Sequence, residues 1–147
     1  ALAVQARAIE PFLFGASALN CEDGDHWLGW SHDSRRPNLT FTTNNTRFLI
    51  LPWVKVPQLA SHVLGRVVRR LNEDWMKKYG HPIHLLETFI DTSTYSGACY
   101  SAAGWRRIGK TTGRGCRAGK AVTKTIKDIL VRPLSKNFKE VLCHVPA

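Results

Sequence analysis

The chain has 147 residues, of which 44% are hydrophobic and 10% aromatic, and its formal net charge is +10. This composition is typical of a globular protein and excludes a disordered chain. No apolar run reaches the roughly 18 residues that a membrane helix needs, so we expect no membrane partner. The length suits one domain, and we interpret residues 1–147 as a single unit.

The cysteines at positions 21, 99, 116 and 143 are widely separated and form no CxxC pair. This spacing does not match a zinc ribbon, and we expect no metal site. The apolar N-terminal stretch is interrupted by Arg7 and Glu10, whereas a secretory signal has an unbroken apolar core. We therefore expect reduced thiols and a cytoplasmic location.

The positive charge is concentrated in the last third of the chain. Residues 1–100 carry ten Lys or Arg and nine Asp or Glu. Residues 101–147 carry eleven Lys or Arg, and their only acidic residues are Asp128 and Glu140. Such a local excess attracts polyanions, so this part of the sequence favours a nucleic-acid partner. A solvated basic surface is the alternative.

The first third of the chain predicts short strands joined by turns. Residues 11–19 read as a buried strand, which a turn at Asp23-Gly24 follows. Residues 26–38 are polar and aromatic, and Pro37 with Asn38 marks them as loop. Residues 39–45 alternate like a strand that runs into a turn at Asn44-Asn45.

The middle of the chain predicts a strand and then a long helix. Residues 47–56, "RFLILPWVKV", are the most apolar stretch and predict a central strand with a bulge or splay at Pro52-Trp53. Residues 58–79 predict a helix that ends at Gly80. Its apolar positions recur at spacings of three and four: Leu59, Ala60, Val63, Leu64, Val67, Val68, Leu71 and Trp75.

The remaining elements complete an α/β order. Residues 81–91 predict a second sheet strand, residues 94–105 a short helix and residues 105–111 a further strand, while residues 125–142 give mixed signals. The order implies an α/β fold with a central βαβ unit. The long helix should begin near Pro57–Ser61 at the carboxyl edge of the sheet, where such folds usually bind anions.

The stretch "GKTTGRGCRAGK", residues 109–120, resembles a phosphate loop. Residues 104–111 spell G-W-R-R-I-G-K-T, which fits the P-loop expression. The run alternates like a strand, however, and Trp and Ile would fill the phosphate cradle, so we interpret the match as false. A basic loop that contacts phosphates and a solvated loop are the two open alternatives. The candidate nucleic-acid contacts are Arg106, Arg107, Lys110, Arg114, Arg117, Lys120, Lys124 and Lys127.

Several long segments of the sequence resemble one known family. They include "LGWSHDSRRPNL", "NNTRFLILPWVKVPQLASHVLGRVVRRL", "YGHPIHLLETFID", "GACYSAAGW", "GKTTGRG" and "KDILVRPLSKNFKEVLC". Their order resembles the domain found in the Druantia anti-phage protein DruA and in transposase-associated bacterial proteins, from about Phe12 to Cys143. The resemblance implies further strands before residue 11, so the domain looks truncated at its N-terminus, and a second copy could complete the sheet.

That family is distantly similar to the GNAT acyltransferases, which implies a GNAT-like mixed sheet and acetyl-CoA or another acyl-CoA as the cofactor. The pyrophosphate loop would then comprise Gln58, Ser61, His62 and Val63, although Ser61 and Val63 stand where GNAT enzymes carry glycine. Glu87 could relay a proton from an amine, and Tyr100 could protonate the departing thiolate. Asp91 is a further acid–base candidate. We favour the structural alternative, in which Glu87 pairs with an arginine and Tyr100 packs in the core.

Several other groups favour structural roles. His62, Arg66, Arg69 and Arg70 share the outer face of the long helix, which is most simply a solvated face. His81 and His84 have no third ligand that the sequence identifies, and most of the five tryptophans should be core.

The leading hypothesis is a basic nucleic-acid-associated accessory module of phage-defence or mobile-element systems that needs no cofactor. An acyl-CoA-dependent N-acyltransferase and an inactive fold remnant are the alternatives.

Overall fold

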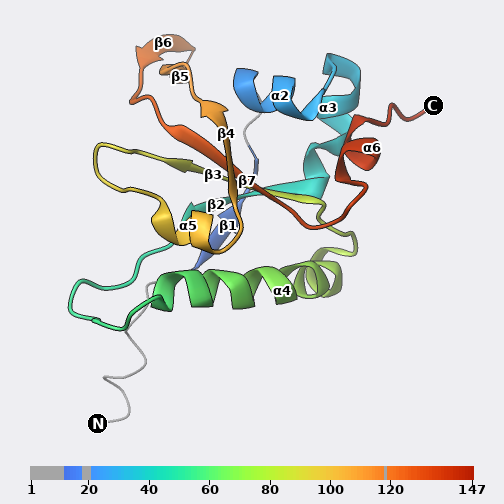
Figure 1. Cartoon of the computed structure of the whole chain (residues 1–147). Coiled ribbons are helices and arrows are strands. Elements are labelled where there is room, and N and C mark those ends of the chain that lie inside the picture. The colour runs from blue at the N-terminus through green and yellow to red at the C-terminus, as the bar shows by residue number, and fades with distance from the viewer. Residues whose placement is uncertain (1–11, 18–20, 118) are drawn as a thin grey trace.

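A computed structural model describes residues 12–17, 21–117 and 119–147, except for the side chains of residues 116 and 117. Helices cover both faces of one mixed sheet (Figure 1). The strands of this sheet are β1 (Leu13–Gly15), β2 (Thr42–Arg47), β3 (Leu85–Ile90), β4 (Arg106–Lys110) and β7 (Asp128–Pro133). The α/β class that the sequence predicts is therefore confirmed.

The sheet has the order β1-β2-β3-β7-β4. Only β2 and β3 are parallel, and the other neighbours are antiparallel. The connection between β2 and β3 contains helix α4 (Leu59–Tyr79), because a parallel pair needs a long crossover. The sequence predicts this βαβ unit with its helix and its second strand, but it places the first strand at residues 47–56.

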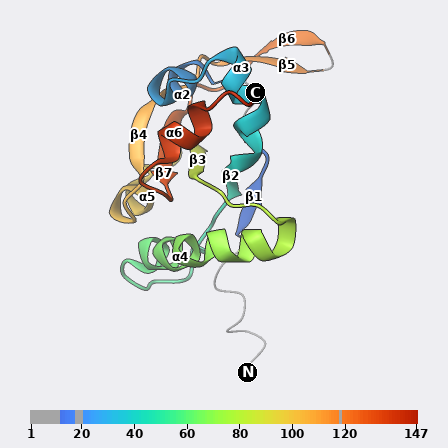
Figure 2. The ribbon, with the colours of Figure 1, turned by 90° about the vertical axis from the view of Figure 1, so that its right-hand side faces the viewer.

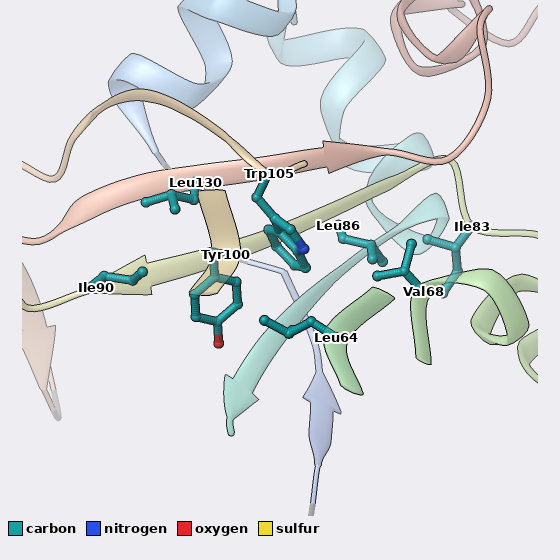
Figure 3. Packing of buried hydrophobic residues seen from close by; sticks show 8 residues of the cluster. All are labelled: Leu64, Val68, Ile83, Leu86, Ile90, Tyr100, Trp105 and Leu130. Carbon is teal, nitrogen blue, oxygen red and sulfur yellow. The ribbon is translucent and has the colours of Figure 1, made fainter. Parts of the chain in front are cut away.

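Helix α4 covers one face of the sheet, as Figure 1 shows below the strands. Its apolar stripe packs in a cluster with β3, β7 and the short helix α5 (Ala98–Ala102). Figure 3 shows this first core, in which the ring of Tyr100 lies between Ile90 and Leu64 and the indole of Trp105 points toward the helix. Its buried members are Leu64, Val68, Ile83, Leu86, Ile90, Tyr100, Trp105 and Leu130.

Three short helices cover the opposite face (Figures 1 and 2). They are α2 (Glu22–Leu28), α3 (His32–Asn38) and α6 (Phe138–Cys143), and a 3-10 turn, η1 (Leu39–Phe41), follows α3. The second core that they close contains Leu28, Leu85, Ile129, Val131 and Leu142. Side chains alternate across β3, so Leu85 and Leu86 belong to different cores.

The central strand of the βαβ unit is not the apolar stretch that the sequence predicts. Strand β2 is the polar run "TTNNTR", and residues 48–58 are mostly loop, with turn at Pro52 and Trp53. Asn44 and Asn45 lie inside the strand rather than in a turn. Asn45 tolerates burial because its amide donates to Leu13 and Arg47 oxygens and accepts from Tyr100.

Helices α2 and α3 replace a predicted turn and a predicted loop. Asp23 and Gly24 lie within α2, whose first turn carries three acidic residues that complement the helix dipole. Ser31 caps α3 through a reciprocal pair of hydrogen bonds with Ser34. A distant contact holds the segment between them: the Trp30 indole donates to the Leu142 oxygen at 2.6 Å.

Strands β5 (Arg114–Arg117) and β6 (Lys120–Thr123) form a separate antiparallel pair that projects beyond the main sheet (Figures 1 and 2). Among the described helices, none combines the length and apolar character needed to cross a membrane.

Candidate functional site

A basic arm projects from the neck between β4 and β7. At the neck, the Thr111 amide donates to the Lys127 oxygen at 2.8 Å, and the Lys127 amide donates to Thr111 Oγ1 at 2.9 Å. Next along the chain, the Lys124 amide donates to the Gly113 oxygen. Gly113 has φ +70°, a conformation that favours glycine. We call residues 113–124 the basic arm.

The basic arm carries exposed cations on both of its faces. Arg114 pairs with Thr123 and therefore shares its face, whereas Lys120 lies three residues before Thr123 and points to the other face. Arg114, Lys120 and Lys124 are all exposed. Among the described residues, none of these three side chains has an acidic partner. The arm therefore offers positive charge to solvent in two directions.

The other predicted nucleic-acid contacts divide into separate groups. Lys110 and Lys127 are exposed at the neck, beside the arm. Arg106 is exposed at the far end of β4. Arg107 has its Nε 2.7 Å from Oδ2 of the buried Asp128, so its charge is already paired. The side chain of Arg117 lies outside the described residues.

The P-loop expression falls on a strand and on the turn before it. Trp105 is buried in the first core and Ile108 packs against the second, so neither leaves backbone open to a phosphate. The glycine at position 109 is explained by packing rather than by phosphate binding. A side chain there would overlap the Asp23 carboxylate, which accepts the Lys110 amide at 2.8 Å. The glycine thus lets α2 approach β4.

A wedge-shaped gap opens between the two parallel strands. The ladder between β2 and β3 ends at Asn44 and Glu87, but β2 continues to Arg47 and β3 to Ile90. A cavity of about 610 Å³ occupies this region. We call it the wedge cavity. It lies at the carboxyl ends of the parallel strands, where ligands commonly bind in α/β sheets.

The wedge cavity has mixed walls. Its polar and charged lining includes Arg47, Asp91, Tyr95, Ser96 and Lys127. Asp91 is held by Ser93, whose hydroxyl and amide both donate to it, and these hydrogen bonds lower the Asp91 pKa, with a smaller contribution from Lys127. The carboxylate is therefore charged at neutral pH. Apolar lining comes from Phe48, Leu49, Ile50 and Ile90.

Two buried side chains that line the wedge cavity, Tyr100 and Thr88, both donate hydrogen bonds to Asn45. The Tyr100 hydroxyl donates to Asn45 Oδ1 at 2.5 Å, and the Thr88 hydroxyl donates to the Asn45 backbone oxygen at 3.0 Å. Burial raises the pKa of Tyr100 to about 12, so this hydroxyl keeps its proton at neutral pH. These groups form a fixed floor.

The two acid–base candidates Glu87 and Tyr100 lie on opposite faces of the sheet. Glu87 is opposite Val131, a member of the second core, and lies near Cys21, whose pKa it helps to raise. It lines a cavity of only about 20 Å³ under α2. Tyr100 belongs to the first core. The structure does not bring these two residues together, whereas Asp91 does line the wedge cavity with Tyr100.

The predicted pyrophosphate loop forms the start of α4. Gln58 has φ +59°, the one positive φ of a non-glycine residue in the described ranges, and its oxygen accepts the His62 amide and the Ser61 hydroxyl. Gln58 and His62 are exposed, and Ser61 and Val63 are half-buried. Of this segment, only the neighbouring Ala60 lines the wedge cavity.

Sequence reasoning missed Asn45 and Tyr95. Asn45 falls where a polar dipeptide indicates a turn, and no local pattern shows its burial. Tyr95 lies in a loop of small polar residues, 59% exposed, without a periodic signal. Within the described ranges, no three His, Cys, Asp or Glu side chains gather closely enough to hold a metal ion. His84 bonds Ser135 through Nδ1 at 2.9 Å.

The chain is similar to a known protein family and, distantly, to a solved structure. The family model described as "Druantia protein DruA" matches residues 4–118. The chain is similar to a solved structure described as "Crystal structure of a putative phosphinothricin N-acetyltransferase", with a TM-score of 0.45 and 20% identity, over 83% of this chain and 82% of that one. A likeness this distant carries no argument about activity. Curated proteins give no match.

Proposed function

This chain belongs to the family of the Druantia protein DruA, and we propose that it is a nucleic-acid-associated accessory module of a phage-defence or mobile-element system. One observation carries the proposal: the basic arm projects from the body and exposes cations on both faces. The family supplies the defence context, and the arm supplies the surface.

A two-stranded ribbon of this kind suits the geometry of nucleic acid. The major groove of duplex DNA admits a two-stranded β-ribbon, and phosphates line both of its walls. Arg114 and Lys120 point to opposite faces of the arm, so each could contact one wall. Contacts of this kind neutralise phosphates and bind without reading the base sequence. We therefore expect binding that depends strongly on salt and little on sequence.

The test is fluorescence anisotropy of the chain with labelled duplex DNA, duplex RNA and single strands across a salt series. The arm variant changes Arg114, Lys120 and Lys124 in the basic arm, together with Lys110 at the neck, to Ala. On duplex DNA each phosphate contact contributes about 0.9 to the slope of log affinity against log salt. If all four residues contact phosphate, the variant should bind much more weakly and its slope should be shallower by about 3–4.

A matched control removes the same charge elsewhere. Arg66, Arg69, Lys77 and Lys78 are exposed on α4, which Figure 1 shows on the opposite side of the molecule from the arm. Changing these four to Ala should leave the slope nearly unchanged. Equal losses in both variants would mean that net charge, not the arm, drives binding. No binding by the native chain at low salt would reject the proposal.

The second candidate is an acyl-CoA-dependent N-acyltransferase, and the wedge cavity favours it. Strands that diverge at their carboxyl ends leave room for an extended cofactor arm. Two features oppose it. Ser61 and Val63 place side chains on the segment that would approach pyrophosphate. The Tyr100 proton is already donated to Asn45, so protonation of a thiolate would first break that hydrogen bond.

Calorimetric titration with acetyl-CoA and with CoA tests this candidate. Binding of either, together with acyl transfer to an amine, would favour the enzyme over the module. A chain that binds neither acyl-CoA nor nucleic acid would be the inactive remnant.

A further inference from the structure

We propose that the wedge cavity takes one unpaired nucleotide of the nucleic acid that the basic arm holds. This inference rests on the proposed function and names the form of nucleic acid that the module prefers: a duplex with a single-stranded end or gap. The occupant is an unpaired base with its phosphate, rather than a free small molecule.

The first argument is continuity between the arm and the cavity. Lys127 belongs to the segment that leads from the arm into β7, and it also lines the wedge cavity. Its backbone is held to Thr111 by two hydrogen bonds, so its place at the neck is fixed. A strand whose phosphates contact Lys120 and Lys124 would reach Lys127 next, at the cavity wall. Cations at Lys120, Lys124 and Lys127 thus follow the chain from the arm to the cavity.

The second argument is the chemistry of the walls. Tyr95 lines the cavity and is 59% exposed, which leaves most of its side chain uncovered by protein. Aromatic faces of this kind stack nucleobases irrespective of sequence. Phe48, Ile50 and Ile90 supply apolar surface, while Lys127 can meet a phosphate and the Asp91 carboxylate can accept from a base amine. The volume of about 610 Å³ lies within the range of about 300–1,000 Å³ found for small-molecule sites.

The third argument concerns what the floor cannot do. Both amide donors of Asn45 and its Oδ1 already have partners, and the hydroxyls of Tyr100 and Thr88 are already donating. The floor therefore has little capacity to read a base edge. Recognition falls to stacking on Tyr95 and to charge at the rim, so we expect only a weak preference among the four bases.

A base paired within a duplex cannot enter such a cavity, because its edge and both faces are occupied. A nucleotide must be unpaired already or leave the helix at an unstacking cost. An overhang avoids that cost. The chain should therefore bind a duplex with a short single-stranded end more tightly than the same duplex with blunt ends.

The experiment compares these two labelled duplexes by anisotropy, at equal salt, with the native chain and three variants. The native chain should prefer the overhang by at least about fivefold, the lower end of what stacking on one aromatic side chain provides. Tyr95→Ala should abolish this preference and leave blunt-end binding unchanged, whereas Tyr95→Phe should keep it. Ala98→Trp places bulk at an exposed position of the cavity lining and should also abolish it.

The outcomes separate the inference from the proposed function. If the chain binds both duplexes equally, the arm functions and the nucleotide site is rejected. If it binds neither, the proposed function itself fails. An overhang preference that survives both Tyr95→Ala and Ala98→Trp would also overturn the inference, because the unpaired nucleotide would then bind elsewhere. Loss of the preference on adding CoA, without loss of blunt-end binding, would support the same cavity as the site.

Discussion

Removal of the Tyr100 hydroxyl should measurably destabilise the chain. The hydroxyl donates to Asn45 Oδ1 at 2.5 Å in a buried setting. In Tyr100→Phe that oxygen loses its partner, and a buried polar group left unpaired costs about 1–3 kcal/mol. This is a large part of the roughly 5–15 kcal/mol by which a domain is stable. The free energy of unfolding from urea titration at neutral pH measures the effect.

The same substitution should change the response to alkali. The pKa of Tyr100 is raised from 10.0 to about 12, chiefly by burial. Its protonated form is therefore favoured by folding, and this contribution is complete below pH 10 and is lost as the pH rises toward 12. At about pH 11 the native chain should have lost about 1.4 kcal/mol through this residue. Tyr100→Phe lacks that loss, so the stability gap between the two proteins should narrow by this amount.

Tyr79→Phe is the matched control, because Tyr79 is 50% exposed and its ring contacts with Trp75 and His81 do not need the hydroxyl. A surface change of this kind should cost less than about 0.5 kcal/mol. Equal stability of Tyr100→Phe and the native chain at neutral pH would refute the reasoning, as would a gap that stays constant up to pH 11.

Three further outcomes follow from single contacts. Gly109→Ala should lower the free energy of unfolding by about 1–3 kcal/mol, because the added methyl group overlaps Asp23. In urea titrations, the double variant with Asp23→Ala should lose less stability than the sum of the two single variants. Arg107→Gln should lower the melting temperature, because it leaves the buried Asp128 carboxylate without its ion pair. Burial lowers the pKa of His84 below 6.5, so folding favours the neutral imidazole and stability should fall as the pH drops below 6.5. In His84→Gln the free energy of unfolding should depend less on pH in this range.

Elements with a strong local period could be predicted from the sequence. Helix α4 begins at Leu59 and ends before Gly80, within one residue of the predicted range, because its apolar stripe and its left-handed glycine cap are both local signals. Strands β3 and β4 and helix α5 were also predicted in their order.

Trp53 is an exception to the prediction that most tryptophans lie in the core, because it is 71% exposed in the loop that replaced the predicted strand.

Elements that depend on distant partners could not be predicted. Strand β2 is polar, and its burial is possible because Thr43 donates to the Gly15 oxygen and Asn45 bonds Leu13. Helix α3 has seven residues and contains a proline, but Asn38 at its end donates to the oxygens of Leu142 and His144. Leu142 and His144 lie more than a hundred residues from Asn38 in the chain, so a local pattern cannot reveal these contacts.

The candidate site likewise combines features that the sequence predicts with features that depend on distant parts of the chain. The cations of the arm could be read from composition, whereas the wedge cavity depends on where the β2–β3 ladder ends. That ending is a tertiary feature, and Asn45 and Tyr95 had no local signal. The pairing of Arg107 with Asp128 likewise removes one predicted contact in a way that charge counting alone does not show.

The neck at Thr111 and Lys127 separates the arm from the body of the domain, whose sheet and two cores are complete without the arm. Among the residues that the structure describes, neither core cluster has a member between 112 and 126, and β4 and β7 already pair below the neck. The arm should therefore open and close without unfolding the sheet, and its amide hydrogens should exchange with solvent far sooner than those of β3 and β7. A short turn between Thr111 and Lys127 should yield a folded body, onto which arms of other lengths and charges could be grafted.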